Sequence, residues 1–178
     1  ITKKTKGIIF TSLFGNVPDV DKINKIAKNH KLFVIEDGAQ SFGAKYKSGY
    51  SCNLTTIGCT SFFPSKNLGC YGDGGAIFTN DDKLAQKMRG LVNHGMYKRY
   101  YHDLVGINSR LDSVQAAILN IKLKNLDKYN KSRRNSAMIY NKLINSSEII
   151  KPIIKYNENS HVFHQYTLRL TNGKRDEM

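Results

Sequence analysis

The feature that most constrains the fold of this chain is a strand–helix–strand pattern near its start. A short apolar run at residues 7–14 predicts a buried strand, and Asp19 then precedes a helical pattern that continues to about residue 30. A second apolar run at residues 32–35 predicts another buried strand. Two strands joined by one helix are usually parallel neighbours in a sheet. The pattern therefore predicts an α/β fold with a parallel sheet.

The second of these strands ends at two carboxylates, Glu36 and Asp37. In open parallel sheets, ligands bind outside the carboxyl ends of the strands. The position of Asp37 in the chain therefore makes it a candidate functional residue.

A single lysine separates an apolar run from a glycine-rich loop in residues 61–76, whose sequence is SFFPSKNLGCYGDGGA. Burial beside a strand end disfavours an ammonium ion, and the neutral amine is the form that attacks a carbonyl carbon. The alternative is an ordinary surface lysine in a turn, which is the commoner state of any one lysine. Lys66 is therefore a candidate nucleophile that its neighbours must support.

Asp37 and Lys66 together allow two interpretations. Each residue follows a predicted strand, so the two side chains could meet as a simple salt bridge. They could also form a pyridoxal phosphate site, in which an amine makes a Schiff base with the cofactor aldehyde and a carboxylate keeps the pyridine nitrogen protonated. Their spacing alone does not choose between these interpretations.

The rest of the sequence continues the alternation of strands and helices. Residues 38–58 and 93–110 are punctuated by glycine and polar residues and predict loops. The apolar pattern predicts strands at residues 59–63, 76–79 and 161–170, and helices at about residues 80–92, 111–126 and 131–144.

The 178-residue chain carries a formal charge of +14, which suits an anionic partner such as nucleic acid or a phosphorylated metabolite. The basic residues are spread along the chain, however, and such helix faces are usually just solvated. The sequence has no run of about 18 apolar residues, so we expect no membrane span. Cys52, Cys59 and Cys70 match neither a C-x-x-C pair nor an even disulfide set, so we expect reduced cytoplasmic thiols and no metal site.

Four motifs resemble the DegT/StrS-type sugar-nucleotide aminotransferases, which are pyridoxal phosphate-dependent enzymes of fold type I. The motifs are EDGAQS at residues 36–41, SFFPSKNLG at 61–69, GDGGA at 72–76 and GINSRLDSVQAA at 106–117. They occur in the family's order, and the resemblance extends from about residue 7 to residue 170. It implies a large domain with a mixed, mostly parallel sheet flanked by helices in residues 1–129, and the start of a smaller domain in residues 130–178.

The resemblance implies a role for each matching position. Lys66 would form the Schiff base and then move a proton between the cofactor and the sugar carbon. Asp37 would pair with the pyridine nitrogen, and Gln40 would lie against the ring or its 3-hydroxyl group. Ser61 would donate to the cofactor phosphate. Asn108 would reach the phosphate of the neighbouring subunit's cofactor, which requires a homodimer with shared active sites.

Three further positions are candidates for substrate binding by the same resemblance. Arg110 would bind an anionic group of the substrate across the subunit interface, and an ordinary surface arginine is the alternative. His164 and Tyr166 resemble a family strand that approaches the substrate, and simple strand packing is the alternative.

The resemblance implies transamination of a nucleotide-linked keto-sugar, with glutamate as the amino donor and with no nucleic-acid or membrane partner. Related sugar dehydratases have histidine at the Schiff-base position, so Lys66 favours amino transfer. Residues 52–73 look closest to enzymes that make 3-amino sugars of the N-acetylhexosaminuronate kind. Gly38 stands where many members have alanine.

Family members are considerably longer, and their N-terminal part supplies a phosphate-binding loop and an aromatic residue that stacks on the ring. We therefore expect this chain to be a fragment of a longer protein. Three alternatives stay open from the sequence. They are another pyridoxal phosphate-dependent enzyme that acts on a sugar, a catalytically inactive fragment, and a basic nucleic-acid-binding module.

Overall fold

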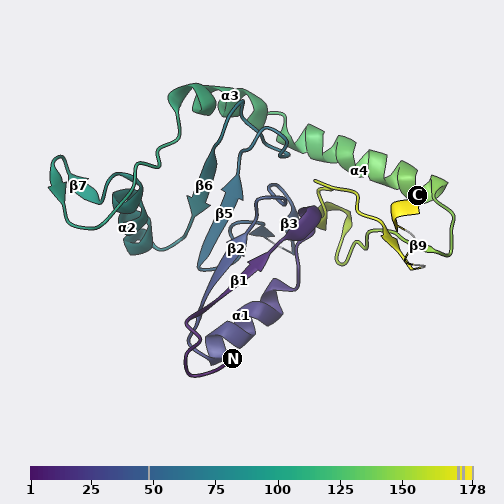
Figure 1. Ribbon diagram of the computed structural model, residues 1–178, viewed down its shortest axis with the longest axis horizontal. Coiled ribbons are helices and arrows are strands. Elements are labelled where there is room, and N and C mark those ends of the chain that lie inside the picture. Colours follow the sequence, from purple (N-terminus) through teal and green to yellow (C-terminus); the bar gives the residue numbers. More distant parts are fainter. Residues whose placement is uncertain (48, 172, 174, 178) are drawn as a thin grey trace.

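A four-stranded sheet forms the centre of the computed structural model, which describes residues 1–47, 49–171, 173 and 175–177 (Figure 1). β1, β2 and β5 are parallel, and β6 runs antiparallel to β5. The predicted α/β fold with a mixed, mostly parallel sheet is confirmed. In spatial order the strands are β1 (Gly7–Thr11), β2 (Phe33–Asp37), β5 (Ile57–Ser61) and β6 (Gly75–Phe78).

The other regular elements surround this sheet, and no helix within the described ranges is long and apolar enough to cross a membrane. The helices are α1 (Val20–Asn29), α2 (Asp82–Val92), α3 (Ser113–Leu123) and α4 (Leu126–Leu143), with 3-10 turns η1 (Leu13–Gly15), η2 (Glu158–Ser160) and η3 (Arg175–Glu177). The short antiparallel strand pairs are β3 (Lys45–Tyr46) with β4 (Gly49–Tyr50), β7 (Met96–Lys98) with β8 (Tyr101–His102), and β9 (Ile149–Ile150) with β10 (Arg169–Leu170).

The crossover helix α1 joins β1 to β2, as the sequence predicts. The Asp19 carboxylate accepts a hydrogen bond from Lys22 N–H and caps the first turn. Val20 and Ala27 are buried, and Phe10 of β1 packs on the apolar cluster that contains Val20. Burial of this stripe holds α1 alongside the sheet (Figure 1).

The break between the two long helices differs from the prediction. The chain bends at Lys124 and Asn125, so α4 starts at Leu126 rather than near residue 131. Leu126 and Asn130 are both almost fully buried, and the helix continues through them because they share its inner face. The expected domain boundary after residue 129 falls inside this continuous helix and stays a prediction.

Both predicted loops contain short hairpins. Residues 38–58 include β3 and β4, and residues 93–110 include β7 and β8. Strands of two or three residues are too short to produce a visible alternation in the sequence. Burial of Tyr46 holds the first hairpin on the core, whereas the ring of Tyr97 in the second hairpin lies against Gly90 of α2.

The predicted strand at residues 161–170 is wrong for most of its length, because only Arg169 and Leu170 form a strand. The preceding residues run as an irregular segment beside η1. Val162 N–H donates to Gly15 O at 2.9 Å, and Gln165 N–H donates to Phe14 O at 3.3 Å. Phe163 has a φ of 45°, which interrupts an extended ladder.

Two apolar clusters stabilise these contacts. One joins α1, the β3–β4 hairpin and the irregular segment, and the other joins the end of β5 to α3 and α4. The second cluster therefore attaches the long helices to the loop that carries Lys66. The clusters consist of Val17, Val20, Ala44, Tyr46 and Val162, and of Phe62, Leu68, Cys70, Leu119 and Leu126.

Candidate functional site

The pairing of β2 with β5 places Asp37 and Ser61 on the same face of the sheet. Asp37 pairs with Cys59, and Ser61 lies two residues beyond Cys59. Side chains alternate along a strand, so these three residues share one face and Glu36 points to the other. β2 and β5 both end on the side of the sheet nearest α3 (Figure 1). Asp37 and Ser61 therefore share one sheet edge.

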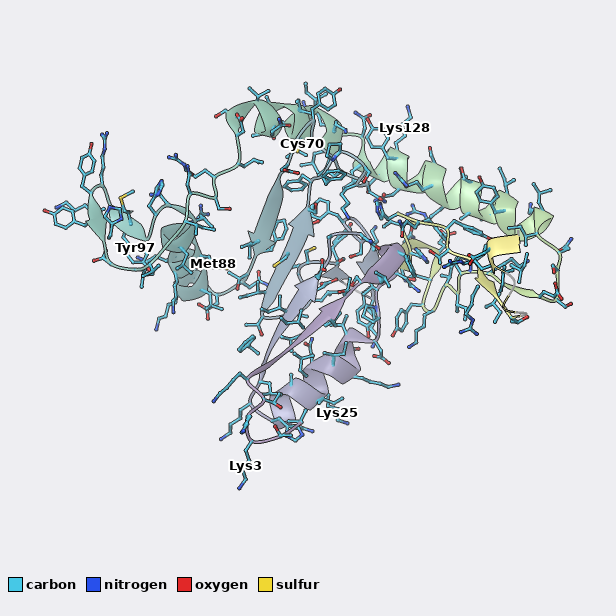
Figure 2. All side chains as sticks on the ribbon, viewed as in Figure 1. Lys3, Lys25, Cys70, Met88, Tyr97 and Lys128 are labelled. Atoms are coloured by element: carbon cyan, nitrogen blue, oxygen red, sulfur yellow. The ribbon has the colours of Figure 1, made fainter. Side chains whose placement is uncertain are left out.

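Lys66 lies in a closed loop that follows β5. Phe62 N–H donates to Gly74 O at 2.7 Å, and Cys70 N–H donates to Phe62 O at 2.8 Å, so the chain returns to its starting point before β6. Cys70 is fully buried, and Lys66 is half-buried. Figure 2 shows Cys70 where the strand ends meet the long helices. The loop holds the Lys66 backbone close to the end of β5.

Asn67 is a site residue that the sequence reasoning missed. Its side-chain amide donates to Asn130 Oδ1 at 2.7 Å and to Val162 O at 3.2 Å, and it is 7% exposed. The residue next to Lys66 is therefore tied both to α4 and to the irregular segment. Asn67 is one polar residue of a loop and Asn130 is one of several polar residues on α4, so the sequence did not indicate their contact.

Gln40 lies in the turn that follows Asp37. Its Oε1 accepts a hydrogen bond from Phe14 N–H at 2.5 Å. Within the described ranges, the two hydrogens of its Nε2 have no acceptor, so they can serve a negatively charged oxygen. The Gln40 amide can therefore donate a hydrogen bond to a ligand oxygen such as that of a phenol.

The polar atoms at this edge fit the cofactor that the resemblance implies. Among the described residues, the Asp37 carboxylate accepts one hydrogen bond, from Ala39 N–H at 3.0 Å, so Oδ2 can pair with a protonated ring nitrogen. Ser61 Oγ accepts from Phe63 N–H at 3.2 Å and keeps its own hydrogen for an anion. The Lys66 amine has no hydrogen-bond or ion-pair partner in the part of the chain that is described. A carboxylate, a hydroxyl donor and an uncommitted amine are the groups that such a cofactor needs.

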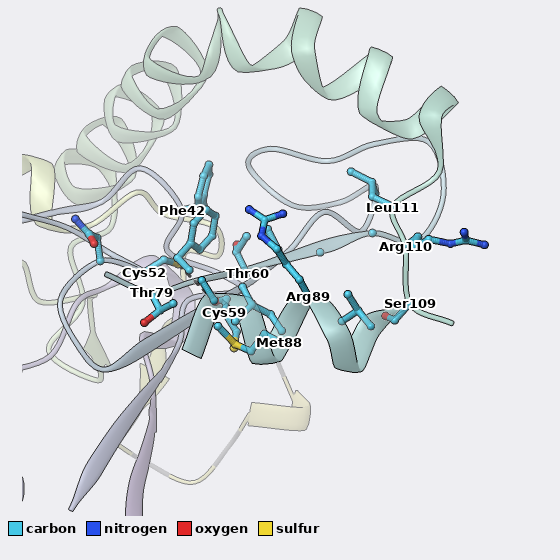
Figure 3. Close-up of a pocket in the computed structure, with 18 of the residues that line it drawn as sticks. Phe42, Cys52, Cys59, Thr60, Thr79, Met88, Arg89, Ser109, Arg110 and Leu111 are labelled. Carbon is cyan, nitrogen blue, oxygen red and sulfur yellow. Dashed lines mark hydrogen bonds between the residues drawn. The ribbon is translucent and has the colours of Figure 1, made fainter. Parts of the chain in front are cut away.

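Asn108 and Arg110 lie elsewhere on the chain, between α2 and α3. Arg110 Nε donates to Asn108 Oδ1 at 3.2 Å. Both residues line a cavity of about 1050 Å³ beside β6 and α2, together with Cys59 and Thr60 (Figure 3). Lys66 does not line this cavity. Asn108 and Arg110 thus line a cavity to which Lys66 does not contribute.

His164 and Tyr166 line a second cavity, of about 650 Å³, between α4 and the irregular segment. Burial lowers the pKa of His164, and the positive charges of Lys66 and Arg133 lower it further, so the imidazole is neutral at pH 7. His164 is thus close enough to Lys66 to feel its charge. Its Nδ1 lies 3.3 Å from Asn67 Oδ1, whereas Tyr166 donates to Asn141 Oδ1 at 2.6 Å.

A close approach of Cys52 explains the glycine at position 38. A Cβ atom on Gly38 would overlap with Cys52 Sγ and would lie 3.0 Å from Ser51 Oγ. Cys52 is 3% exposed and has a φ of 72°, so it has little room to withdraw. All three cysteines are free thiols. Cys52 fills the space beside Gly38, so the departure from alanine noted in the sequence has a steric cause.

The chain belongs to the DegT/DnrJ/EryC1/StrS aminotransferase family, whose sequence profile matches residues 1–178. Members of this family depend on pyridoxal phosphate. The four motifs of the sequence therefore identified the family correctly.

Two curated relatives illustrate the similarity. The chain is 53% identical to the UDP-2-acetamido-2-deoxy-3-oxo-D-glucuronate aminotransferase of Pseudomonas aeruginosa, over 97% of this chain and 48% of that protein. It is 44% identical to the UDP-N-acetyl-3-dehydro-alpha-D-glucosamine 3-aminotransferase of Acidithiobacillus ferrooxidans, over 96% of this chain and 46% of that protein. The chain therefore spans about half the length of the curated relatives it matches.

Solved structures share the fold. Streptomyces venezuelae DesV, in complex with a ketimine intermediate, is 38% identical with a TM-score of 0.93, over 99% of this chain and 47% of that chain. A family aminotransferase from Brucella abortus is 39% identical with a TM-score of 0.89, over 97% of this chain and 45% of that chain.

The contact between Gly38 and Cys52 gives a testable prediction. We expect Gly38→Ala to lower the free energy of unfolding by about 1–3 kcal/mol, because the new methyl group overlaps with the thiol. Adding Cys52→Ala removes the overlapping sulfur, so the double variant should lose less stability than the sum of the two single variants. Urea denaturation of the three variants measures this coupling.

The matched control is Gly72→Ala, whose methyl group would meet only the end of the Gln115 side chain, at 3.1 Å. It should change the stability far less than Gly38→Ala. Strictly additive effects of Gly38→Ala and Cys52→Ala would contradict the steric explanation.

Proposed function

We propose that the protein is a pyridoxal phosphate-dependent aminotransferase that converts a nucleotide-linked keto-sugar into an amino sugar, with glutamate as the amino donor. The observation that carries this proposal is that Asp37 and Ser61 lie on one face where neighbouring parallel strands end, and that Lys66, in the loop after β5, has no partner for its amine among the described residues. The family and the names of its curated relatives support the same activity.

Each residue has a role that its surroundings allow. The cofactor, when bound, withdraws electrons from the carbon that carries the transferred amine. Asp37 would accept a hydrogen bond from the ring nitrogen, and Ser61 would donate one to the phosphate. Gln40 would donate from its amide to the ring oxygen. Lys66 would hold the cofactor and, once released, would move the proton between the cofactor carbon and the sugar carbon.

The substrate that the proposal favours is a UDP-linked 3-keto sugar with an acetamido group and a carboxylate. The Pseudomonas aeruginosa relative is named for an acidic sugar of this kind. Arg110 has a guanidinium group suited to a carboxylate, and it is exposed. His164 and Tyr166 line the cavity beside α4, and the charge of Lys66 acts on His164, so both residues are candidates to contact the sugar.

We further propose that the enzyme is a cytoplasmic homodimer with shared sites. Asn108 and Arg110 line a cavity to which Lys66 does not contribute, which is compatible with a role in the partner's site. The β7–β8 hairpin beside them projects from the body and exposes aromatic rings, among which Tyr100 is 75% exposed (Figure 2). An exposed aromatic group of this kind is typical of an interface.

The nucleic-acid alternative has less support. Lys3 lies at the bottom of the view in Figure 2 and Lys128 lies near its top, so these two basic residues do not belong to one patch. Two alternatives remain for a turnover assay to distinguish from amino transfer. One is a different pyridoxal phosphate-dependent reaction on a sugar, and the other is an inactive protein.

We expect the complete protein to convert more than one equivalent of glutamate per active site into 2-oxoglutarate only when a UDP-linked 3-keto sugar is present, and to form the amino sugar in equal amount to that turnover. Lys66→Ala should lower kcat at least about 10²-fold, because the proton transfer loses its base. Mass spectrometry of both products measures the reaction. Lys87→Ala, at an exposed position on α2, is the matched control and should keep the wild-type rate. A different sugar product, or undiminished turnover by Lys66→Ala, would contradict the proposal.

Mixed dimers test the shared site. Lys66→Ala and Arg110→Ala subunits should each be weakly active alone, but their heterodimer contains one site with both residues intact. Co-expressed subunits with different tags should therefore regain about a quarter of the wild-type activity, because half of the dimers carry one intact site of two. No recovery on mixing would mean that Arg110 serves the site of its own chain.

A further inference from the structure

A second carboxylate lies directly behind Asp37. Glu36 is 0% exposed and points to the opposite face of β2 from Asp37. Fully buried carboxylates are rare unless other groups compensate for their charge. No Lys or Arg forms an ion pair with Glu36 in the described part of the chain. The compensation must come from neutral donors.

Three short hydrogen bonds to Glu36 provide this compensation for its charge. Ser12 O–H and Ser51 O–H donate to Oε1 at 2.7 and 2.6 Å, and Cys52 N–H donates to Oε2 at 2.7 Å. Since Ser51 uses its one hydrogen on Glu36, its 2.5 Å contact with Ser41 is a bond donated by Ser41. Every donor thus points towards Glu36. Three possible donors and no obligate acceptor contact Glu36, and this set of partners suits the charged form of the carboxylate.

These donors come from the segments that form the candidate site. Ser12 follows β1, and Ser41 lies in the turn that also carries Gln40. Ser51 and Cys52 lie on the approach to β5, which ends at Ser61. Through these hydrogen bonds, Glu36 connects the segment that follows β1 to the segment that precedes β5, and these two strands flank β2.

The charges of Glu36 and Asp37 act on the same space. Burial raises the pKa of Cys52 to about 12, and the negative charges of Glu36 and Asp37 add to this increase. Burial and then Asp37 also raise the pKa of Cys59, on the neighbouring strand. Both thiols are therefore neutral at pH 7 and do not offset either carboxylate.

We propose that ionised Glu36 is a positioning residue of the cofactor site, which adds a second negative charge behind Asp37 and so helps to keep the cofactor's ring nitrogen protonated. This inference rests on the proposed function. Two carboxylates on opposite faces of one strand are close enough for the hidden charge to be felt at the ring, because a buried charge is only weakly screened.

The test is Glu36→Gln in the complete holoenzyme, which removes the charge and keeps the shape. The pH at which the bound cofactor's visible absorbance gives way to its near-ultraviolet absorbance reports the proton on the nitrogen that joins Lys66 to the cofactor, which is conjugated with the ring. This midpoint should fall by about one unit, because the positively charged form loses a nearby anion. The affinity of the apoprotein for pyridoxal phosphate, followed by fluorescence, should fall by up to about tenfold for the same reason.

Ser12→Ala is the matched control, because it removes one hydrogen bond and leaves the charge in place. Its absorbance midpoint should equal that of the wild type, even if its stability falls. If Glu36→Gln does not fold, Glu36→Met combined with Ser51→Ala removes the charge together with one unpartnered donor and should give the same decrease.

An unchanged midpoint in a charge-removing variant would overturn the inference, as would an equal shift in Ser12→Ala, which would reveal a purely structural role. Both results leave the proposed function intact, since the wild type would still show cofactor absorbance that Lys66→Ala abolishes. Absence of that absorbance from the wild type would instead refute the proposed function and this inference together.

Discussion

The register between β2 and β5 is the constraint on which the candidate site depends. Asp37 pairs with Cys59, so the carboxylate points to the face on which Ser61 also lies. A shift of one residue would turn Asp37 to the opposite face and bring Glu36 forward in its place. The buried face specifies this register strongly, because Glu36 finds its three donors only there. The hydrogen bonds of Glu36 thus determine that Asp37 is the carboxylate that can face a ligand.

The loop after β5 depends on contacts that are distant in sequence. Asn67 bonds to Asn130 on α4 and to Val162 in the irregular segment, and both apolar partners of the loop, Leu119 and Leu126, come from the long helices. The position of Lys66 is therefore set partly by residues more than 50 places further along the chain. A movement of α4 would reach the lysine through these bonds.

Much of the sheet could be predicted from the sequence because its strands are apolar and end at clear signals. The crossover helix carries a capping aspartate and an apolar stripe, and β2 ends at the carboxylates of Glu36 and Asp37. The end of β5 at Ser61 lies two residues before the predicted end, because apolar residues continue past it. The irregular segment at residues 161–168 was predicted as a strand, because alternation cannot reveal the positive φ of Phe163 or a partner as irregular as η1. The hairpins at β3–β4 and β7–β8 were missed because their strands are too short to alternate.

The candidate site was only partly predictable for a related reason. Chemical type and strand position pointed to Asp37 and Lys66, and the family motifs added Gln40, Ser61 and Asn108. The supporting roles of Glu36, Asn67 and Asn130 were not predicted, because they arise from hydrogen bonds that exist only after folding. The need for glycine at position 38 was also not predictable, because it arises from the close approach of the Cys52 thiol in the folded chain.

The most direct test of this account is chemical trapping of the cofactor lysine. The complete protein would be incubated with pyridoxal phosphate, reduced with borohydride, digested, and mapped by mass spectrometry. We predict selective labelling of Lys66, with no label at this position or at any other lysine in Lys66→Ala. Labelling spread over many lysines of a folded protein would contradict the central claim, because it would mean that this sheet edge does not hold the cofactor.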